Sequence, residues 1–304
     1  MFSLFLTEKI GHPDKGDTNM LIAESIAQDL KTYAFRPAEL FLEDNILKAN
    51  AHIVSSDNGV LSENEKTEII DLSEKTIVTI RLNPPFDSRY FSSMMLLHHY
   101  KNRARIYNNP LAIVNYPEKI LDARLLKFTP KTLVTESLNQ IENFWRQNKD
   151  IIIKPLYEFA GRSVFRLKEE EENYKSIFQI ISEKYNEPLI AQKYIPEVKN
   201  GDKRIVLIDG EYIGCFNRIP PQGQLQAAIA RGGSLEKSEL TSREKEICEI
   251  LKPILKIEEI TICGLDTIGD YLTEVNVTCP SGMVGLKKLY DIDSAKLYWE
   301  TILK

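Results

Sequence analysis

The apolar positions in the first third of the chain follow two periods, one typical of strands and one typical of helices. Residues 2–6 form a continuous apolar run, residues 75–82 alternate between two faces, and residues 18–30 have helical spacing with Asp17 as a candidate N-cap. In order, the pattern predicts a strand at 2–6, a helix at 18–30, a strand at 75–82, a helix at 88–100 and a strand at 112–115. This alternation indicates an α/β layer with parallel strands, and we place it at residues 1–118.

Strands dominate the pattern in the rest of the chain. A segment at 119–187 is predicted to begin with a short helix, followed by a helix at 137–147 and strands at 150–156 and 163–167. The last segment, 188–304, is predicted to contain strands at 189–194, 204–208, 211–217, 260–266 and 272–277 and one long helix at 242–255. Asp209-Gly210 is a hairpin turn signal, and the four carboxylates at 169–172 suit the start of a helix.

Polar side chains interrupt an otherwise apolar hairpin near the C-terminal end. Glu274 and Asn276 are two positions apart, so they share a strand face about 6–7 Å apart. A two-residue turn at Gly269-Asp270 would send Asp266 to the opposite face, whereas a three-residue turn at 268–270 would bring it beside Glu274. With the second turn, two carboxylates and an amide form an oxygen set suited to Mg²⁺. Otherwise Glu274 would pair with a lysine and Asn276 would cap a turn.

Composition excludes several classes of protein. The 304 residues carry 39 basic and 44 acidic side chains, a formal net charge of −5, and we therefore expect no nucleic-acid partner. No apolar run approaches the ~20 residues that span a bilayer, and the first residues lack the pattern of a signal peptide, so no membrane contact is expected. The four cysteines have no metal-binding spacing and predict a reducing, cytoplasmic location.

Six segments share their order and approximate spacing with one enzyme family. They are RLNPPFD (81–87), TPKTLVT (129–135), FWRQNKDIIIKPL (144–156), AQKYIPEVKNGDKRIVLIDGE (191–211), RIP (218–220) and CGLDTIGDYLTEVNVTCPSG (263–282). Together they resemble the bacterial glutathione synthetases, which are ATP-grasp carboxylate–amine ligases. The resemblance implies a doubly wound α/β domain followed by a two-part α+β ATP-grasp module. It also implies a reaction in which ATP phosphorylates the carboxylate of a γ-glutamyl dipeptide, such as γ-glutamylcysteine, and a glycine-like amine displaces the phosphate.

The same resemblance implies roles for individual residues. The metal ligands would be Asp266, Glu274 and Asn276, which would hold two Mg²⁺ or Mn²⁺ ions. The ATP site would contain Lys154, Gly161, Arg162, Gln192, Lys193, Tyr194 and Ile195. Arg204 and Arg218 would line the reaction centre, and the peptide side would contain Asp17, Arg231, Asn276, Thr278 and Ser281. Phosphoryl transfer between two anions requires this kind of positioning and charge neutralisation. The family also implies small-molecule substrates and a homo-oligomer.

Three departures from the family pattern keep a second interpretation open. The phosphate lid at 157–163 retains only Gly161 of its glycines, which let backbone amides approach phosphates. The helix before TPKTLVT is about two turns shorter than in the family pattern. The lysine that normally lies there near the nucleotide has no clean counterpart, and Lys127 is the nearest candidate. The loop after RIP has Gln and Ala at 226–228 where the family has Arg-Gly-Asn, with Arg231 as a shifted substitute. Because the metal set survives, we expect an active ligase. The alternative is a non-catalytic, nucleotide-binding or regulatory paralogue.

Overall fold

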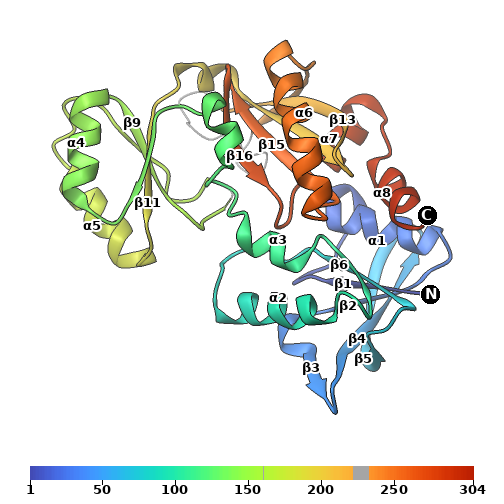
Figure 1. Ribbon diagram of the computed structural model, residues 1–304. Helices are drawn as coiled ribbons and strands as arrows, with labels where there is room; N and C mark the ends of the chain where they lie inside the picture. Colours follow the sequence, from blue (N-terminus) through green and yellow to red (C-terminus); the bar gives the residue numbers. More distant parts are fainter. Residues whose placement is uncertain (160, 222–232) are drawn as a thin grey trace.

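The computed structural model describes residues 1–159, 161–221 and 233–304, and within them the chain forms three sheets of seven, four and five strands (Figure 1). The layer around the second sheet lies at the left of the view, and the other two sheets lie at the right, one above the other. None of the helices in these ranges is both long and apolar enough to cross a membrane.

The first sheet combines a parallel core with an antiparallel edge. Its strands are β1 (Phe2–Leu6), β2 (Lys31–Phe35), β3 (Leu40–Glu43), β4 (Ile46–Asp57), β5 (Val60–Asp71), β6 (Thr76–Ile80) and β7 (Arg105–Tyr107). The order is β3-β4-β2-β1-β6-β7 with β5 paired to β4. Strands β2, β1, β6 and β7 run parallel to one another, whereas β4 is antiparallel to β2. The predicted parallel layer is therefore present, together with a long β4–β5 hairpin that the pattern did not predict.

Helices cover both faces of this sheet, which makes it doubly wound as expected. On one face, Phe5 and Ile77 pack with α1 (Asp17–Ala27) and α8 (Ser294–Ile302). On the other face, Leu4 and Val78 pack with α2 (Ser88–Tyr100) and α3 (Pro110–Asn115). The C-terminal helix α8 thus returns to the first domain, beside the N-terminal helix (Figure 1).

Two predictions for this domain are wrong. Residues 112–115 belong to α3 rather than a strand, because Pro110 begins the helix and the Asn109 side chain accepts a hydrogen bond from the Leu111 amide. Helix α1 has Gly16 rather than Asp17 as its N-cap residue. The Asp17 carboxylate serves another helix, as described below.

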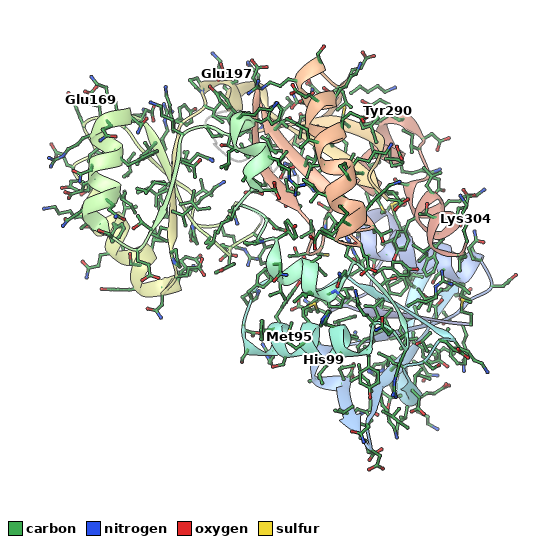
Figure 2. The ribbon with its side chains drawn as sticks, viewed as in Figure 1. Met95, His99, Glu169, Glu197, Tyr290 and Lys304 are labelled. Atoms are coloured by element: carbon green, nitrogen blue, oxygen red, sulfur yellow. The ribbon has the colours of Figure 1, made fainter. Side chains whose placement is uncertain are left out.

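The second sheet is antiparallel and is covered by two helices. Its strands are β8 (Thr132–Thr135), β9 (Ile151–Pro155), β10 (Phe165–Leu167) and β11 (Leu189–Lys193), in the order β10-β9-β11-β8. Ile151 and Ile153 pack against Trp145 of α4 (Leu138–Asn148) and Phe178 of α5 (Tyr174–Tyr185). The acidic run at 169–172 precedes α5 rather than starting it, and Glu169 lies at the outer end of this layer (Figure 2).

The third sheet is also antiparallel and has the order β14-β13-β12-β15-β16. Its strands are β12 (Asp202–Ile208), β13 (Glu211–Ile219), β14 (Ser234–Lys237), β15 (Ile262–Ile268) and β16 (Tyr271–Asn276). Helix α6 (Ser242–Ile257) packs on one face, and α7 (Met283–Tyr290) packs on the other through Leu286 and Phe216. Short 3₁₀ segments lie at η1 (Pro13–Lys15), η2 (Pro37–Glu39), η3 (Ala123–Phe128) and η4 (Pro196–Asn200).

Candidate active site

A β-bulge in the β15–β16 hairpin brings the predicted acidic residues together. The connection is the two-residue turn Gly269-Asp270, since Ile268 pairs with Tyr271. Thr267 pairs with Leu272 and Asp266 with Glu274, so β16 advances by one extra residue, Thr273. The expectation that a two-residue turn would send Asp266 to the opposite face is therefore wrong, because that expectation assumed an uninterrupted ladder. Asp266 and Glu274 are direct cross-strand neighbours.

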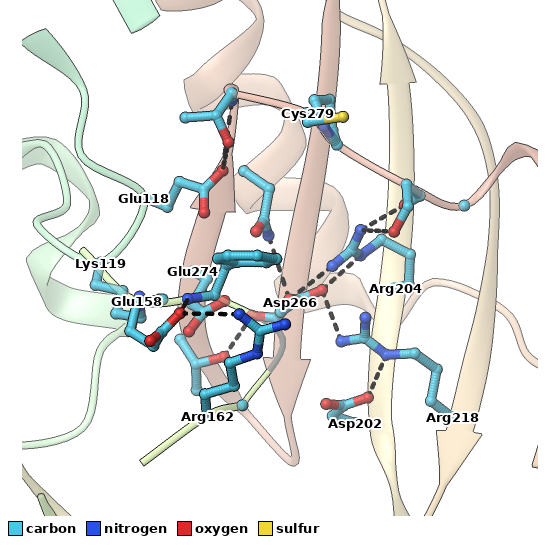
Figure 3. A pocket seen from close by; sticks show the side chains of 18 of the residues that line it. Glu118, Lys119, Glu158, Arg162, Asp202, Arg204, Arg218, Asp266, Glu274 and Cys279 are labelled. Atoms are coloured by element: carbon cyan, nitrogen blue, oxygen red, sulfur yellow. Dashed lines mark hydrogen bonds and ion pairs between the residues drawn. The ribbon is translucent and has the colours of Figure 1, made fainter. Parts of the chain in front are cut away.

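Asp266 is the centre of a buried ion-pair network (Figure 3). Its carboxylate is 5% exposed and accepts two hydrogen bonds from Arg204, from Nε at 2.6 Å and from Nη2 at 2.9 Å. Arg218 Nη2 lies 2.9 Å from Asp266 Oδ1, and Arg218 Nε donates to Asp202 at 2.5 Å. Burial opposes ionisation of Asp266, but the charges of both arginines outweigh it and hold the pKa of this carboxyl well below its usual range.

Lys154 and Glu274 form a second, looser pair beside this network. Lys154 lies on β9 of the second sheet, and its Nζ is 3.4 Å from Glu274 Oε1. Because the lysine is only 8% exposed, burial lowers its pKa, and the nearby Glu274 charge works against that shift. The sequence left open whether this lysine lies on the surface, and the structure places it inside.

These charged groups line one cavity of about 900 Å³ where the three sheets meet. The first domain contributes Asp17 and Arg81, the second sheet Lys154 and Gln192, and the third sheet Arg204. The predicted residues that line it are Asp17, Lys154, Gly161, Arg162, Gln192, Lys193, Tyr194, Ile195, Arg204, Arg218, Asp266, Glu274, Asn276, Thr278 and Ser281. Positions scattered over 265 residues of sequence thus share one cavity.

Asp17 lines the cavity but uses its carboxylate to cap α7. Its oxygens accept hydrogen bonds from the backbone amides of Gly282 at 2.5 Å, Met283 at 2.7 Å and Val284 at 3.0 Å. These amides would otherwise lack acceptors at the start of the helix. Asp17 therefore orients α7 and the loop before it, in which Ser281 accepts a hydrogen bond from Arg204.

Residues 192–195 run along one wall of the cavity. Gln192 Nε2 donates to Thr132 Oγ1 at 2.9 Å, and the Lys193 and Tyr194 amides donate to the Lys131 and Asp150 carbonyls. The Arg166 guanidinium lies 3.5 Å from the centroid of the Tyr194 ring. This part of the wall is fixed by its own contacts before any ligand binds.

The altered lid forms its own network. The Glu158 carboxylate accepts a hydrogen bond from Tyr185 at 2.9 Å and lies 3.9 Å from Arg162, whose guanidinium stacks over Phe159. Lys119 donates to the backbone carbonyls of Leu156 and Glu158 and so ties the lid to the linker between domains. The Glu158 charge therefore has partners within the lid itself.

Several residues with charged side chains in this cavity, among them Arg81 and Glu118, had no role in the sequence prediction. Glu118 accepts a hydrogen bond from Thr278 Oγ1 at 2.5 Å, and burial raises the pKa of its carboxyl while this bond opposes the shift. Arg81 belongs to the RLNPPFD segment, but its partners, Thr18 and Pro280, are remote in sequence.

Lys127, the candidate for the nucleotide-side lysine, lies on the surface, where its ammonium group pairs with Glu246 at 2.7 Å. The loop positions 226–228 and Arg231 lie outside the described residues.

The oxygen atoms available to a metal come from two carboxylates and one amide. In the described ranges, no three Asp, Glu, His or Cys side chains are grouped as a metal site. Asp266, Glu274 and Asn276 nevertheless lie together, and Asn276 Nδ2 donates to Asp266 Oδ2 at 3.2 Å and to the Gly264 carbonyl at 3.2 Å. Because the amide nitrogen of Asn276 makes these two hydrogen bonds, its side-chain carbonyl oxygen remains available as a metal ligand. This is a hard-oxygen set that fits Mg²⁺.

Comparison with protein families covers nearly the whole chain. Residues 4–113 match the model of the prokaryotic glutathione synthetase N-terminal domain, and residues 118–291 match that of the prokaryotic glutathione synthetase ATP-grasp domain. The chain belongs to the prokaryotic glutathione synthetase family. Glutathione synthetase from Agrobacterium fabrum is 36% identical over 95% of this chain and 92% of its own length. The Coxiella burnetii glutathione synthetase is 35% identical over 92% of this chain and 89% of its own.

Solved structures share the fold at much lower identity. The D-cycloserine synthetase DcsG has a TM-score of 0.68 and 12% identity, and covers 99% of this chain and 98% of its own. The macrocyclase MdnC from Microcystis aeruginosa has a TM-score of 0.65 and 17% identity over the full length of both chains. At these identities the likeness concerns the fold alone, and it agrees with the expected ATP-grasp architecture.

Proposed function

We propose that this protein is an ATP- and Mg²⁺-dependent ligase that joins the carboxylate of a γ-glutamyl dipeptide to the amine of an amino acid. The observation that carries the proposal is the array of three cations around two carboxylates in the cavity, namely the buried Lys154 and Arg204 and the half-buried Arg218. Membership of the glutathione synthetase family supplies the reaction class, which forms a C–N bond and converts ATP to ADP and phosphate.

The reaction requires two anions to approach each other. When a donor carboxylate attacks the γ-phosphate, negative charge accumulates around the transferred group. Lys154, Arg204 and Arg218 are held by Glu274 and Asp266, so their charges are oriented before the substrates bind. The amine then attacks the acyl phosphate, a step that depends mainly on orientation. We assign Arg204 and Arg218 to the transferred phosphate and Lys154 to the ATP phosphates.

Mg²⁺ would be held by Asp266, Glu274 and Asn276 and would supply further neutralisation of the phosphates, and Mn²⁺ offers the same coordination chemistry. We assign the nucleotide-binding wall of the cavity to residues 192–195, and we assign Gly161 and Arg162, which line the same cavity, to the ATP site as well. The peptide side would be formed by Asn276, Thr278 and Ser281, with Asp17 acting through its cap on α7. We further propose that the enzyme is cytoplasmic, since ATP and reduced thiol substrates are available in the cytoplasm. As the family resemblance implies, we also propose that it is a homo-oligomer.

The test is a direct assay of ligation. Purified protein is mixed with ATP, MgCl₂, γ-glutamylcysteine and each of a panel of amino acids, while ADP release and the mass of the product are followed. We expect ADP and tripeptide in equal amounts with a small amino acid. Lys154→Met should lower the rate by at least about 100-fold, since a buried charge on the phosphates is lost. Lys127→Met is the matched control, because Lys127 lies on the surface.

Two outcomes would contradict the proposal. If ADP appears with none of the pairs, or without a peptide product, the ligase function is wrong. Tight ATP binding that persists without turnover, and that Asp266→Ala leaves unchanged, would instead identify a non-catalytic nucleotide-binding protein.

A further inference from the structure

A buried carboxylate that has no place in the proposed reaction lies where α6 meets the third sheet. Glu244, in the first turn of this helix, is 3% exposed. Its Oε1 accepts a hydrogen bond from Thr267 Oγ1 at 2.7 Å, and its Oε2 accepts from Lys203 Nζ at 2.7 Å and from the Thr241 amide at 2.8 Å. The bond from Thr241 belongs to the capping box of the helix. The other two bonds join the helix to strands β15 and β12.

The two strand residues that Glu244 binds are neighbours of the reaction centre. Lys203 and Thr267 pair directly across β12 and β15, and the next pair along these strands is Arg204 and Asp266. Successive side chains of a strand point to opposite faces of the sheet. Arg204 and Asp266 therefore face the cavity, while Lys203 and Thr267 face α6. Glu244 thus links the two strands from the far side of the sheet, one residue away from the ion pair in the cavity.

Asp266 lies at the β-bulge, where the ladder between β15 and β16 is interrupted. Two threonine side chains make hydrogen bonds at this point. Thr273 Oγ1 donates to the Asp266 carbonyl at 3.0 Å, and Thr267 Oγ1 donates to Glu244. Both threonines are buried. The position of Asp266 relative to Glu274 therefore depends on a bond to α6 as well as on the pairing of the strands.

The same turn of α6 also binds the tip of this hairpin. Arg243 Nε donates to the carbonyl of Asp270, in the turn between β15 and β16, at 2.7 Å, and Arg243 Nη2 donates to the Lys127 carbonyl at 3.0 Å. Farther along, α6 packs on the hairpin through Leu251, and Figure 1 shows the helix beside β15. Two consecutive residues of one helix thus hold the hairpin at two points, next to the bulge and at the turn.

The burial of the Lys203–Glu244 ion pair calls for a reason other than stability. Its side chains are 14% and 4% exposed, and an ion pair that loses its water seldom adds net stability. A capping box needs only the bonds to the backbone. The additional bonds to Lys203 and Thr267 fix the distance between the helix and the two strands. Such fixed geometry raises the affinity of a metal site, because its ligands are in place before the ion arrives.

We infer that Glu244 is a positioning residue for the metal site. It acts through Thr267 and Lys203, which lie next to the ion pair in the cavity. The inference rests on the proposed function in one respect, since it takes Asp266 and Glu274 as ligands of Mg²⁺. It requires metal binding to weaken when α6 is disconnected from β15, although none of the described residues that line the cavity belongs to α6.

The experiment measures metal binding without turnover. Electron paramagnetic resonance gives the concentration of free Mn²⁺ as Mn²⁺ is titrated into protein that holds a non-hydrolysable ATP analogue. Thr267→Val, which keeps the shape of the side chain but removes its hydroxyl, should weaken Mn²⁺ binding about 10-fold. Thr267→Ser, which keeps the hydroxyl and its hydrogen bond, should stay within about twofold of the wild type. The Mg²⁺ concentration that half-activates ADP release should change by the same factors, while KM for the donor stays unchanged.

Two further variants test the other contacts of the helix. Glu244→Gln should weaken Mn²⁺ binding at least as much as Thr267→Val, because it also leaves Lys203 without its counter-charge. Arg243→Gln breaks the bonds to the turn outside the core and should weaken Mn²⁺ binding about threefold. Since Arg243 is not buried, this variant gives a result even if the others fail to fold.

The matched controls lie in the first domain. Thr32→Val removes a buried hydroxyl on β2 that shares a hydrogen bond with Ser25 at 2.7 Å. Glu39→Gln changes a second glutamate that closes a capping box. Both variants should lower the free energy of unfolding in urea and leave Mn²⁺ binding unchanged.

The inference is overturned if Thr267→Val and Arg243→Gln bind Mn²⁺ as the wild type does, or if Thr267→Ser weakens binding as much as Thr267→Val. In the first case Glu244 only stabilises the fold. If Mn²⁺ binding depends on Thr267 in this way but no donor supports ADP release, the ligase function fails and the positioning role stands. Ligation by a protein whose variants all bind Mn²⁺ equally well would leave the function intact and remove the positioning role. A wild-type protein that binds no Mn²⁺ would remove the metal assignment and this inference together.

Discussion

Replacing Asp17 by alanine should destabilise the protein because it uncaps α7. The three backbone amides at the start of this helix donate to one carboxylate that is only 7% exposed. A side-chain cap is worth about 0.5–2 kcal/mol, and a carboxylate at a partly buried helix N-terminus adds up to about 2 kcal/mol. We therefore expect the free energy of unfolding to fall by about 3 kcal/mol. Asp17→Asn, which keeps one acceptor oxygen but loses the charge, should cost about half as much.

Urea unfolding followed by circular dichroism gives this difference from the shift of the midpoint at constant slope. Hydrogen exchange gives the local effect, since 3 kcal/mol corresponds to roughly 100-fold faster exchange in the first turn of α7. Asp14→Ala is the matched control, because its side chain is 80% exposed on the same loop. A loss below about 1 kcal/mol for Asp17→Ala would refute the capping argument. A raised KM for the donor with unchanged stability would point instead to a direct role in substrate binding.

Three further predictions concern the buried network, a glycine and a histidine. Asp266→Asn should cost about 3–5 kcal/mol in urea unfolding, because it leaves the buried guanidinium of Arg204 without its counter-charge. Gly282→Ala should lower the melting temperature measured by calorimetry, since its φ is +151° and a Cβ would lie 2.5 Å from Val206 Cγ2. The Asn64 carbonyl and Glu39 raise the pKa of His52 against a smaller effect of burial, so the stability that His52 contributes is present below about pH 6.5 and is lost as the pH rises through the raised value. The difference in unfolding free energy between the wild type and His52→Gln should therefore shrink from pH 5 to pH 8.

The sequence predicts elements well where the signal is local. The helix at 88–100 has the predicted bounds, because Asp87 caps it through the Tyr90 amide and its apolar spacing is continuous. Residues 112–115 are buried and apolar in part, and a short run of this kind does not distinguish a strand from a helix. The capping contact of Asn109 decides the outcome there.

The site depends on contacts that no local pattern contains. Asp266 reaches the same face as Glu274 through a bulge, and neither turn length considered from the sequence includes a bulge. The Asp17 carboxylate meets its three backbone amide donors 265 to 267 positions away, and Glu118 meets Thr278 160 positions away. The types of residue in the site could therefore be predicted, whereas their partners could not.

The net charge of −5 does not reveal that several cations gather in the cavity, where anionic substrates are proposed to bind. In the structure each of the three cations pairs with an acid, Arg204 and Arg218 with Asp266 and Lys154 with Glu274. A free triphosphate would have to separate these pairs and leave the acids unpaired in a buried place, which is costly. A triphosphate that arrives with its own divalent cation would instead exchange partners, because the cation would bind the acids and the phosphates would bind the arginines and the lysine. If the proposed function holds, the same acids would keep the cations oriented before binding and would make the cavity selective for a metal-bound nucleotide over a free one.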